Sequence, residues 1–392
     1  MFPLPPLTDE QRRVVDRVAT LSRERFAPRA ARYDAESSFP YENYADLHAA
    51  GLNALTVPRE YGGVDADAVT YVHALREIAK GCSATALTFN MHSTVVTFLA
   101  ALGTEEQKRR YFGEVVGRGA RIASITSEPE QSFRDKFVLN TVFHQTDGGY
   151  RVAGVKQFCS LGEAADYFFI TGILEGTTTA REGVVSAMIP SRDAGVKIEG
   201  TWNAVGMRGT ISHTIRYDCA VDRANVIGRP GQYLTIDLQG FALGYAAVYL
   251  GIAEGALAFA IDYAKHRIVK PENIPVAHDP AVQRHVGELS AHLDGALLVL
   301  ADTAQRWEPA DVLERGVLGN KAKYLATEVG LAVTSKVIQV VGGRGAYKDF
   351  PAERAFRDLR TSTLMPPTVD RMLEGIGKNA LGIEAGMFKI SE

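Results

Sequence analysis

The sequence has little of what marks several large classes of protein. Cysteine is rare: Cys82, Cys159 and Cys219 are the three in 392 residues, and they lie far apart. An odd and scattered set argues against a disulfide framework and against a cysteine-ligated zinc site. We therefore expect a reducing, cytoplasmic setting.

An excess of charge of one sign is also missing. Lys and Arg number 43 and Asp and Glu number 46, which gives a formal net charge of −3, and the two signs are interleaved along the chain. A protein that binds DNA or RNA usually gathers basic residues on one face. No nucleic-acid partner is expected.

Long hydrophobic runs are also missing. No apolar run approaches the ~20 residues that a membrane-spanning helix needs, and residues 1–10 lack the basic and apolar parts of a signal peptide. We expect neither a membrane nor a secretory route. What is present is an ordinary composition, 46% hydrophobic and 23% charged, and enough length for two or three packed units.

Apolar periodicity divides the chain into three parts. Helical patterns fill the first third; residues 8–11 fit a capping box, and residues 83–102 are apolar on all sides. The β-rich runs that follow are 121–126, 138–144, 150–158, 167–174, 184–189 and 210–221. Residues 147–148, Asp-Gly, indicate a hairpin between two of them.

Long helical patterns return after Gly231. They cover 241–266, 280–307, 317–341 and 369–388, which suggests an antiparallel bundle. The predicted fold is mainly α with a central β-domain. Its predicted limits are a helical domain at 1–120, a β-barrel-like domain at 121–229 and a four-helix bundle at 230–392.

Six short segments give this order a family resemblance. They are Leu-Gly-Thr-Glu-Glu-Gln at 102–107, Thr-Ser-Glu-Pro at 126–129, Val-Lys-Gln-Phe-Cys-Ser at 155–160, Gly-Met-Arg-Gly-Thr at 206–210, Gln-Val-Val-Gly-Gly-Arg-Gly at 339–345 and Glu-Arg-Ala-Phe-Arg-Asp-Leu-Arg at 353–360. Their order and spacing resemble the acyl-CoA dehydrogenase superfamily. The resemblance implies FAD, with FMN as an alternative, held between the last two domains, and a homotetramer.

A flavin ring needs hydrogen-bonding groups and an apolar wall. By the resemblance, Ser127 and Ser160 supply hydroxyls near the ring edge and its N5 atom, and Phe158 is the wall in place of the usual Trp. Taken alone, these are half-buried strand residues bonded to the backbone. Ser132 is the expected contact on the phosphate side of the same region.

The flavin phosphates need close main-chain N–H groups and a cation. The resemblance assigns Gln339, Gly342, Gly343 and Arg267 to contacts with a neighbouring subunit's FAD, and Thr368 to the cofactor as well. Without the resemblance, the two glycines fit a helix C-cap followed by a tight turn.

The resemblance fails at the catalytic base. An acyl-CoA dehydrogenase removes a proton α to a thioester while hydride moves to the flavin, and a carboxylate accepts the proton. The usual glutamate position is Pro366, which has no acid–base chemistry, and the alternative position in the family falls near Phe241. The arginine that holds CoA falls near Ala242. Asp370 is the nearest carboxylate, and it also fits the start of the last helix, where it complements the dipole.

Three hypotheses about function stay open. The family default is α,β-dehydrogenation of an acyl-thioester, with Asp370 as an unusual base and an electron-transfer flavoprotein as partner. The second is a monooxygenase that takes reduced flavin from a flavin reductase and needs no such base. His92, within 83–102, is its candidate for oxygen chemistry, or else a core histidine with a backbone partner. The third is a flavin-binding subunit without catalysis.

Overall fold

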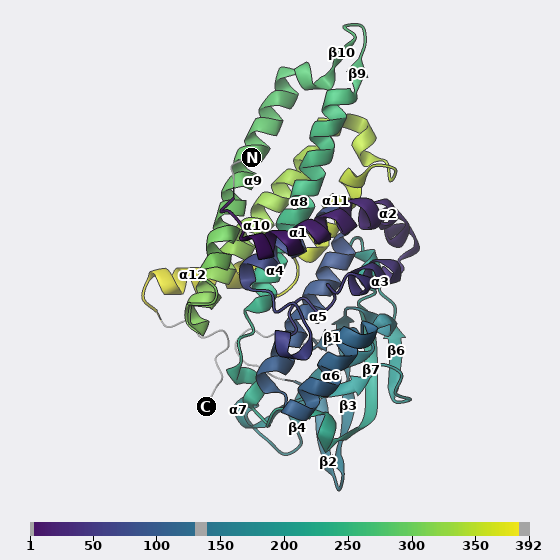
Figure 1. Ribbon diagram of the computed structural model, residues 1–392, viewed down its shortest axis with the longest axis vertical. Coiled ribbons are helices and arrows are strands. Elements are labelled where there is room, and N and C mark those ends of the chain that lie inside the picture. The colour runs from purple at the N-terminus through teal and green to yellow at the C-terminus, as the bar shows by residue number, and fades with distance from the viewer. Residues whose placement is uncertain (1–3, 130–138, 384–392) are drawn as a thin grey trace.

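The N-terminal third folds into helices because its apolar side chains recur on one face. The computed structural model describes residues 4–129 and 139–383; Figure 1 traces the chain through them. As predicted, α1 (Asp9–Leu21) begins at a Thr8 capping box, and α5 (Ser83–Leu102) is buried along nearly its whole length. The other helices here are a π-helical turn (Ser22–Phe26), α2 (Ala27–Glu36), α3 (Tyr41–Ala49), α4 (Ala68–Gly81) and α6 (Glu105–Arg118).

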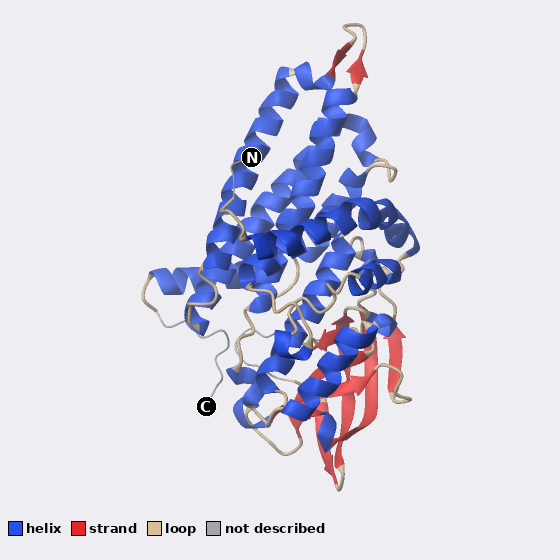
Figure 2. Ribbon diagram, in the orientation of Figure 1, coloured by secondary structure: helices blue, strands red, loops and turns tan. Residues whose placement is uncertain are grey.

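The middle of the chain forms an eight-stranded sheet at one end of the molecule (red in Figure 2). The order is β6-β7-β3-β2-β4-β5-β8, and β1 pairs in parallel with β4. The predicted Asp-Gly hairpin joins β2 to β3. The strands are β1 (Ile122–Ile125), β2 (Val142–Thr146), β3 (Gly149–Cys159), β4 (Tyr167–Leu174), β5 (Val184–Pro190), β6 (Val196–Gly200), β7 (His213–Asp222) and β8 (Val226–Ile227).

One predicted strand begins later than expected. Residues 210–212 precede β7, and Arg208–Thr210 forms a 3-10 turn between two residues with positive φ, Met207 at 52° and Ile211 at 41°. The carboxylate of Asp358 accepts the Met207 main-chain N–H at 2.6 Å. This contact with the C-terminal helices holds the turn, so the alternating pattern does not continue as a strand.

The C-terminal third is a helical bundle, shown in green to yellow in Figure 1. Its long helices are α8 (Gly240–His266), α9 (Pro280–Gln305) and α10 (Val312–Val341), and β9 (Ile268–Val269) pairs with β10 (Ile274–Pro275) beyond α8. The fourth predicted helix is short within the described residues, α12 (Val369–Ala380). The helix α11 (Pro351–Ser362) also packs on α8 and α10, which together bury its apolar face.

α11 is also where the three domains meet. Arg357 donates to Asp34 of α2 at 2.7 Å and to the carbonyl oxygen of Val205, before the 3-10 turn, at 2.8 Å. The neighbouring Asp358 binds Met207 from the other side. These two adjacent charged residues therefore link the β-domain and the N-terminal helices to the bundle, as does the buried ion pair between Arg76 of α4 and Glu254 of α8.

Among the described residues, three helices are long and apolar enough to cross a membrane by length and composition alone. They are Ser83–Leu102, Gly240–His266 and Val312–Ala346. The expectation that no segment reaches this length was wrong, because scattered Gly, Ser and Thr interrupt the apolar runs without lowering the average hydropathy below the limit. Their most apolar stretches are 83%, 78% and 44% buried inside the protein.

Candidate functional site

A buried ion pair ties the ends of β1 and β3 together. Glu128 and Lys156 are 2% and 0% exposed, and Glu128 Oε1 lies 2.7 Å from Lys156 Nζ. Burial lowers the pKa of Lys156 to about 8, against the opposing effect of the Glu128 charge. Burial alone would raise the pKa of Glu128, but the ammonium and the N–H groups of Asn140 and Thr141 lower it. Glu128 is thus fully engaged as an anchor of the strand ends.

The predicted ring-side residues are brought together at these strand ends. The main-chain N–H of Gln157 donates to the Ser127 carbonyl oxygen at 2.9 Å, which joins the two segments. Phe158 has a φ of 57° and is 57% exposed, with its ring edge-on to Trp202 at 6.2 Å. A strained backbone that presents an aromatic face fits the wall of a flat ring. Ser160, 6% exposed, follows directly.

The predicted phosphate-side residues lie together at another place, the far end of the bundle from the sheet in Figure 1. Arg267 caps α8, while Gln339 and Gly342 stand at the exposed end of α10, with Gly342 at a φ of 77°. Phe350, which follows this turn, packs on Tyr263 at 5.7 Å between ring centroids and so keeps the two ends adjacent. Gly343 is exposed beside Gly342.

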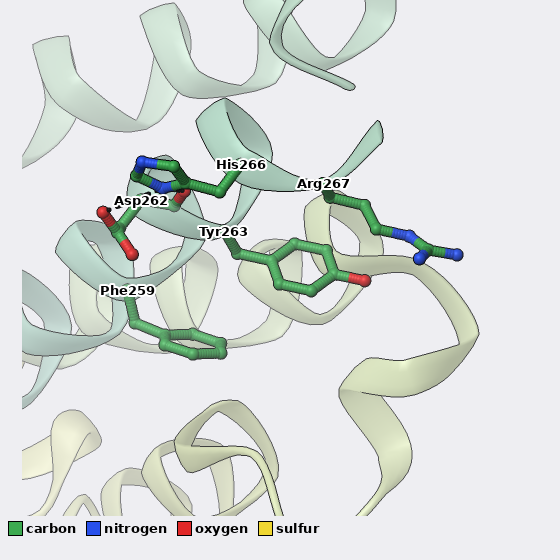
Figure 3. Close-up of a pocket in the computed structure, with 5 residues that line it drawn as sticks. All are labelled: Phe259, Asp262, Tyr263, His266 and Arg267. Atoms are coloured by element: carbon green, nitrogen blue, oxygen red, sulfur yellow. Dashed lines mark hydrogen bonds and ion pairs between the residues drawn. The ribbon is translucent and has the colours of Figure 1, made fainter. Parts of the chain in front are cut away.

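A pocket of about 300 Å³ opens at this end of α8 (Figure 3). Phe259, Asp262, Tyr263, His266 and Arg267 line it. The rings of Phe259 and Tyr263 lie below Asp262 and His266 in the view, and the Arg267 side chain extends away from the others (Figure 3). This end of α8, beside β9 and β10, lies away from the sheet whose strand ends carry the ring-side residues (Figure 1).

The segment that should carry the base is held by a buried lysine that sequence reasoning missed. Lys323 of α10 is 0% exposed, and its Nζ donates to the carbonyl oxygens of Met365 and Pro367, at 2.6 Å each. The Tyr245 ring lies 5.0 Å from the same nitrogen. Burial lowers the pKa of Lys323 to about 7. The sequence carries no clear signal for this role, because Lys323 lies among other polar residues of the helix, such as Asn320 and Lys321.

The two predicted catalytic residues, Asp370 and His92, lie on different helices. Asp370 is exposed in the first turn of α12, after Thr368 at the N-cap, where its charge complements the helix dipole. Pro366 is exposed as well. The remaining predicted contact, Ser132, lies outside the described residues. The roles of Asp370 and Thr368 stay predictions.

His92 is buried in α5, and both nitrogens of its ring are bonded to the backbone. The Ile122 N–H donates to Nδ1 at 3.1 Å, so the proton is on Nε2, which lies 3.2 Å from the Asn53 carbonyl oxygen. Burial lowers the pKa of His92 to about 4, which keeps the ring neutral. In this geometry the ring has no free donor for a cofactor, and a part in oxygen chemistry stays a prediction.

A flavin fits the groups that these segments present. An exposed aromatic face, a hydroxyl beside it and a strand end held by a buried ion pair suit the ring. The open turn at Gly342, where an added Cβ would touch nothing within 4 Å, suits a phosphate.

Comparison with known families agrees with this geometry. Family models described as the N-terminal, middle and C-terminal domains of acyl-CoA dehydrogenase match residues 8–118, 123–219 and 243–364. The chain is 33% identical over 359 residues to a dibenzothiophene monooxygenase of Rhodococcus erythropolis, covering 86% of this chain and 85% of the relative. It is 28% identical over 385 residues to an acyl-CoA dehydrogenase of Bacillus subtilis, covering 96% and 99%.

Solved structures give the same result. Butyryl-CoA dehydrogenase from Megasphaera elsdenii superposes with a TM-score of 0.88 at 22% identity, covering 96% of this chain and 99% of that one. A dibenzothiophene monooxygenase from Paenibacillus, solved with FMN and indole, has a TM-score of 0.87 at 25% identity, covering 97% and 100%. The chain belongs to the acyl-CoA dehydrogenase family and is a flavin-dependent oxidoreductase with relatives among both its dehydrogenases and its monooxygenases.

Proposed function

We propose that this protein is a monooxygenase that uses reduced flavin to oxidise a small aromatic substrate. One observation carries the proposal. The segment that bears the base in dehydrogenases of the family has Pro366 at that position and is bound by the Lys323 ammonium. Removal of an α-proton needs a proton acceptor there, whereas oxygenation by a reduced flavin does not.

The substrate class is proposed from the relatives and from the helices beside the sheet. Dibenzothiophene and indole, in the relatives' names, are flat aromatic heterocycles. On α8, the rings of Phe241, Tyr245 and Tyr249 lie nearly parallel, with centroids 6.3 and 6.0 Å apart. Across from them on α5, the buried Asn90 Nδ2 has no hydrogen-bond partner among the described residues. Aromatic walls with one free donor suit a flat ligand with a heteroatom.

The residues of the chain divide the work in this proposal. When bound, reduced flavin supplies the activation of oxygen. Phe158 supports the ring, Ser127 and Ser160 hold its edge, and the Glu128–Lys156 pair keeps the strand ends in place. The helices α5 and α8 orient the substrate and exclude water.

The direct test supplies FMN reduced by a flavin reductase, oxygen labelled with ¹⁸O, and dibenzothiophene or indole. We expect products heavier by one labelled oxygen atom, detected by mass spectrometry. The proposal fails if no member of a wider aromatic panel gains the label while the protein demonstrably binds flavin.

Acyl-thioester dehydrogenation is the second candidate, with Asp370 as base and an electron-transfer flavoprotein as partner. It is supported by the similarity to the Bacillus subtilis enzyme over 96% of the chain. Mixing the protein that carries oxidised FAD with short, branched and long acyl-CoAs under anaerobic conditions would bleach the flavin. Asp370→Asn should then abolish bleaching without loss of flavin; unchanged turnover would exclude Asp370.

We also propose that FAD, if it is the natural flavin, lies between copies of a homotetramer in the cytoplasm. Arg267 then contacts the FAD of a neighbouring subunit. Arg267→Glu should weaken FAD binding by roughly tenfold, because a charge-assisted contact with the adenylate half of FAD is lost. FMN lacks that half, so its binding should be nearly unchanged. Fluorescence titration with both flavins checks this, and Lys265→Glu, at an exposed position two residues earlier, is the control. Equal losses for FAD and FMN would contradict the assignment.

A further inference from the structure

Three hydroxyl groups beside the ring-side residues form a continuous chain. Ser160 Oγ lies 2.9 Å from Ser212 Oγ, which lies 2.8 Å from Thr210 Oγ1, which lies 2.8 Å from the Met207 carbonyl oxygen. The three side chains are 6%, 5% and 0% exposed, respectively. The chain runs from the strand end at Ser160 into the turn before β7.

The direction of these hydrogen bonds is fixed by the carbonyl at the inner end. A carbonyl oxygen only accepts, so the Thr210 hydroxyl must donate its single proton to Met207. Ser212 must then donate to Thr210, and Ser160 must donate to Ser212. If the bonds ran in the opposite direction, Thr210 Oγ1 and the Met207 carbonyl oxygen would face each other at 2.8 Å with no proton between them. The shared dependence makes the three groups act as a unit.

The consequence falls on Ser160. Because its only hydroxyl proton is donated to Ser212, the Ser160 oxygen can accept a hydrogen bond from a neighbouring group but cannot donate one. It stands at the end of the hydroxyl chain opposite Met207 and follows the exposed Phe158 by two residues.

Resting on the proposed function, we infer that the Thr210–Ser212 pair makes Ser160 a hydrogen-bond acceptor toward flavin N5 and so makes the site favour reduced flavin. The N5 atom of an oxidised flavin has a lone pair and no hydrogen, whereas the N5 atom of a reduced flavin carries one. An acceptor at this place binds the reduced form and repels the lone pair of the oxidised form. Thr210 and Ser212 are positioning residues, since they act only through Ser160.

This role suits a protein that takes reduced flavin from solution. A site that prefers the reduced form captures it in the presence of oxidised flavin. A hydroxyl free to rotate would donate to the oxidised form as readily as it accepts from the reduced one, and would give no such preference.

The test compares dissociation constants for oxidised FMN and for dithionite-reduced FMN under anaerobic conditions. We expect the unmodified protein to bind reduced FMN more tightly. Thr210→Val removes the hydroxyl that accepts from Ser212 and leaves Ser160 in place. The Ser212 hydroxyl can then donate to Ser160, which reverses the direction of that hydrogen bond. The preference should fall by roughly five- to tenfold, mainly through tighter binding of oxidised FMN, as expected for one hydrogen bond gained. Ser212→Ala should give the same direction of change.

Two further variants separate this effect from loss of packing. Thr210→Ser keeps the hydroxyl and should restore the preference. Thr171→Val removes the hydroxyl of another fully buried threonine, in β4, which has no hydrogen-bond partner among the described residues, and should leave the preference unchanged. If Thr210→Val does not fold, Ser212→Ala against Ser212→Thr decides the question in the same way.

The outcomes are distinct. If Thr210→Val and Ser212→Ala keep the preference of the unmodified protein for reduced FMN, or if Thr171→Val loses it equally, the inference is overturned but the proposed function stands. A chain that binds neither form of FMN nor FAD overturns the proposed function itself. A preference lost in Thr210→Val and Ser212→Ala and kept in Thr210→Ser supports the inference.

Discussion

Buried polar residues decide much of the local structure near the candidate site. His92 joins α5 to β1 through the Ile122 N–H and to the segment before α4 through the Asn53 carbonyl oxygen. Lys323 joins α10 to the segment at Met365 and Pro367. Each satisfies main-chain groups that would otherwise be buried without partners, which is costly.

The first prediction at this scale concerns His92. His92→Ala leaves both main-chain groups unpaired and opens a small cavity, so the free energy of unfolding should fall by about 2–4 kcal/mol. Urea denaturation measures this, and His144→Ala, at a half-buried strand position with only a solvent-exposed partner, Glu175, should have little effect. The same variant tests oxygen chemistry: increased peroxide release from the reduced enzyme would give His92 a catalytic part, and unaltered release would leave it structural.

Lys323 gives a pH-dependent prediction. Its pKa falls from 10.5 when unfolded to about 7 in the folded protein because of burial. Between these values the unfolded chain binds a proton that the folded protein does not, so this residue makes stability rise as pH increases from about 7 to 10.5. Below pH 7 both states are protonated and the contribution is flat.

Lys323→Met should remove this part of the pH dependence, measured as the difference in urea midpoint between pH 7 and pH 9.5. Lys321→Met, at an exposed position on the same helix, should retain it. A Lys323→Met protein with the unmodified slope would show that the ammonium is not desolvated as described.

At the scale of secondary-structure elements, small residues allow the helices to pack closely. On α8, a Cβ at Gly251 would lie 2.5 Å from the Arg76 carbonyl oxygen and 2.7 Å from the Ala79 Cβ of α4. On α9, a Cβ at Gly295 would meet nothing within 4 Å. The same residue type therefore has a packing role in one helix and none in the other.

The same substitution should have opposite effects at these two glycines. Gly251→Ala should destabilise by about 1–3 kcal/mol, because the main chain of α4 must move. Gly295→Ala should stabilise by about 0.5–1 kcal/mol, since alanine loses less backbone entropy in a helix. Thermal unfolding of the two variants checks this; destabilisation of equal size in both would contradict the packing argument.

At the scale of the whole molecule, many polar contacts join the domains, and Arg357 makes several of them. Arg357 pairs with Asp34 and with Glu353, at 2.7 and 2.6 Å, and reaches the Val205 carbonyl oxygen. Its side chain is 18% exposed, so these charges are mostly shielded from water. One residue thereby joins the N-terminal helices, the β-domain and the bundle.

Arg357→Ala should lower the free energy of unfolding by about 2–3 kcal/mol, because two carboxylates at the domain junction lose their partner. Calorimetry should show a broader transition as the domains unfold less cooperatively. Arg216→Ala removes an exposed pair with Glu199 within the sheet and should leave the transition unchanged. A sharp, unshifted transition in Arg357→Ala would mean that the junction rests on apolar packing instead.

The sequence by itself determined the order of helices, sheet and bundle, the family and the loss of the usual base at Pro366. These follow from apolar periodicity and from motifs whose residues are close together in the chain, and both are local properties. Element limits were right within a few residues wherever periodicity was strong, as at α5 and β4.

Only the tertiary structure decided what the polar residues do. The partners of His92, Lys323 and Ser160 are distant in sequence or depend on a turn, so no spacing rule could assign them. Sequence reasoning left two roles open for His92, whereas in the fold both ring nitrogens are hydrogen-bonded to main-chain groups. The residue type shows that Ser160 has a hydroxyl, but the direction in which that hydroxyl donates depends on Met207, because the geometry of the partners sets the direction of a hydrogen bond.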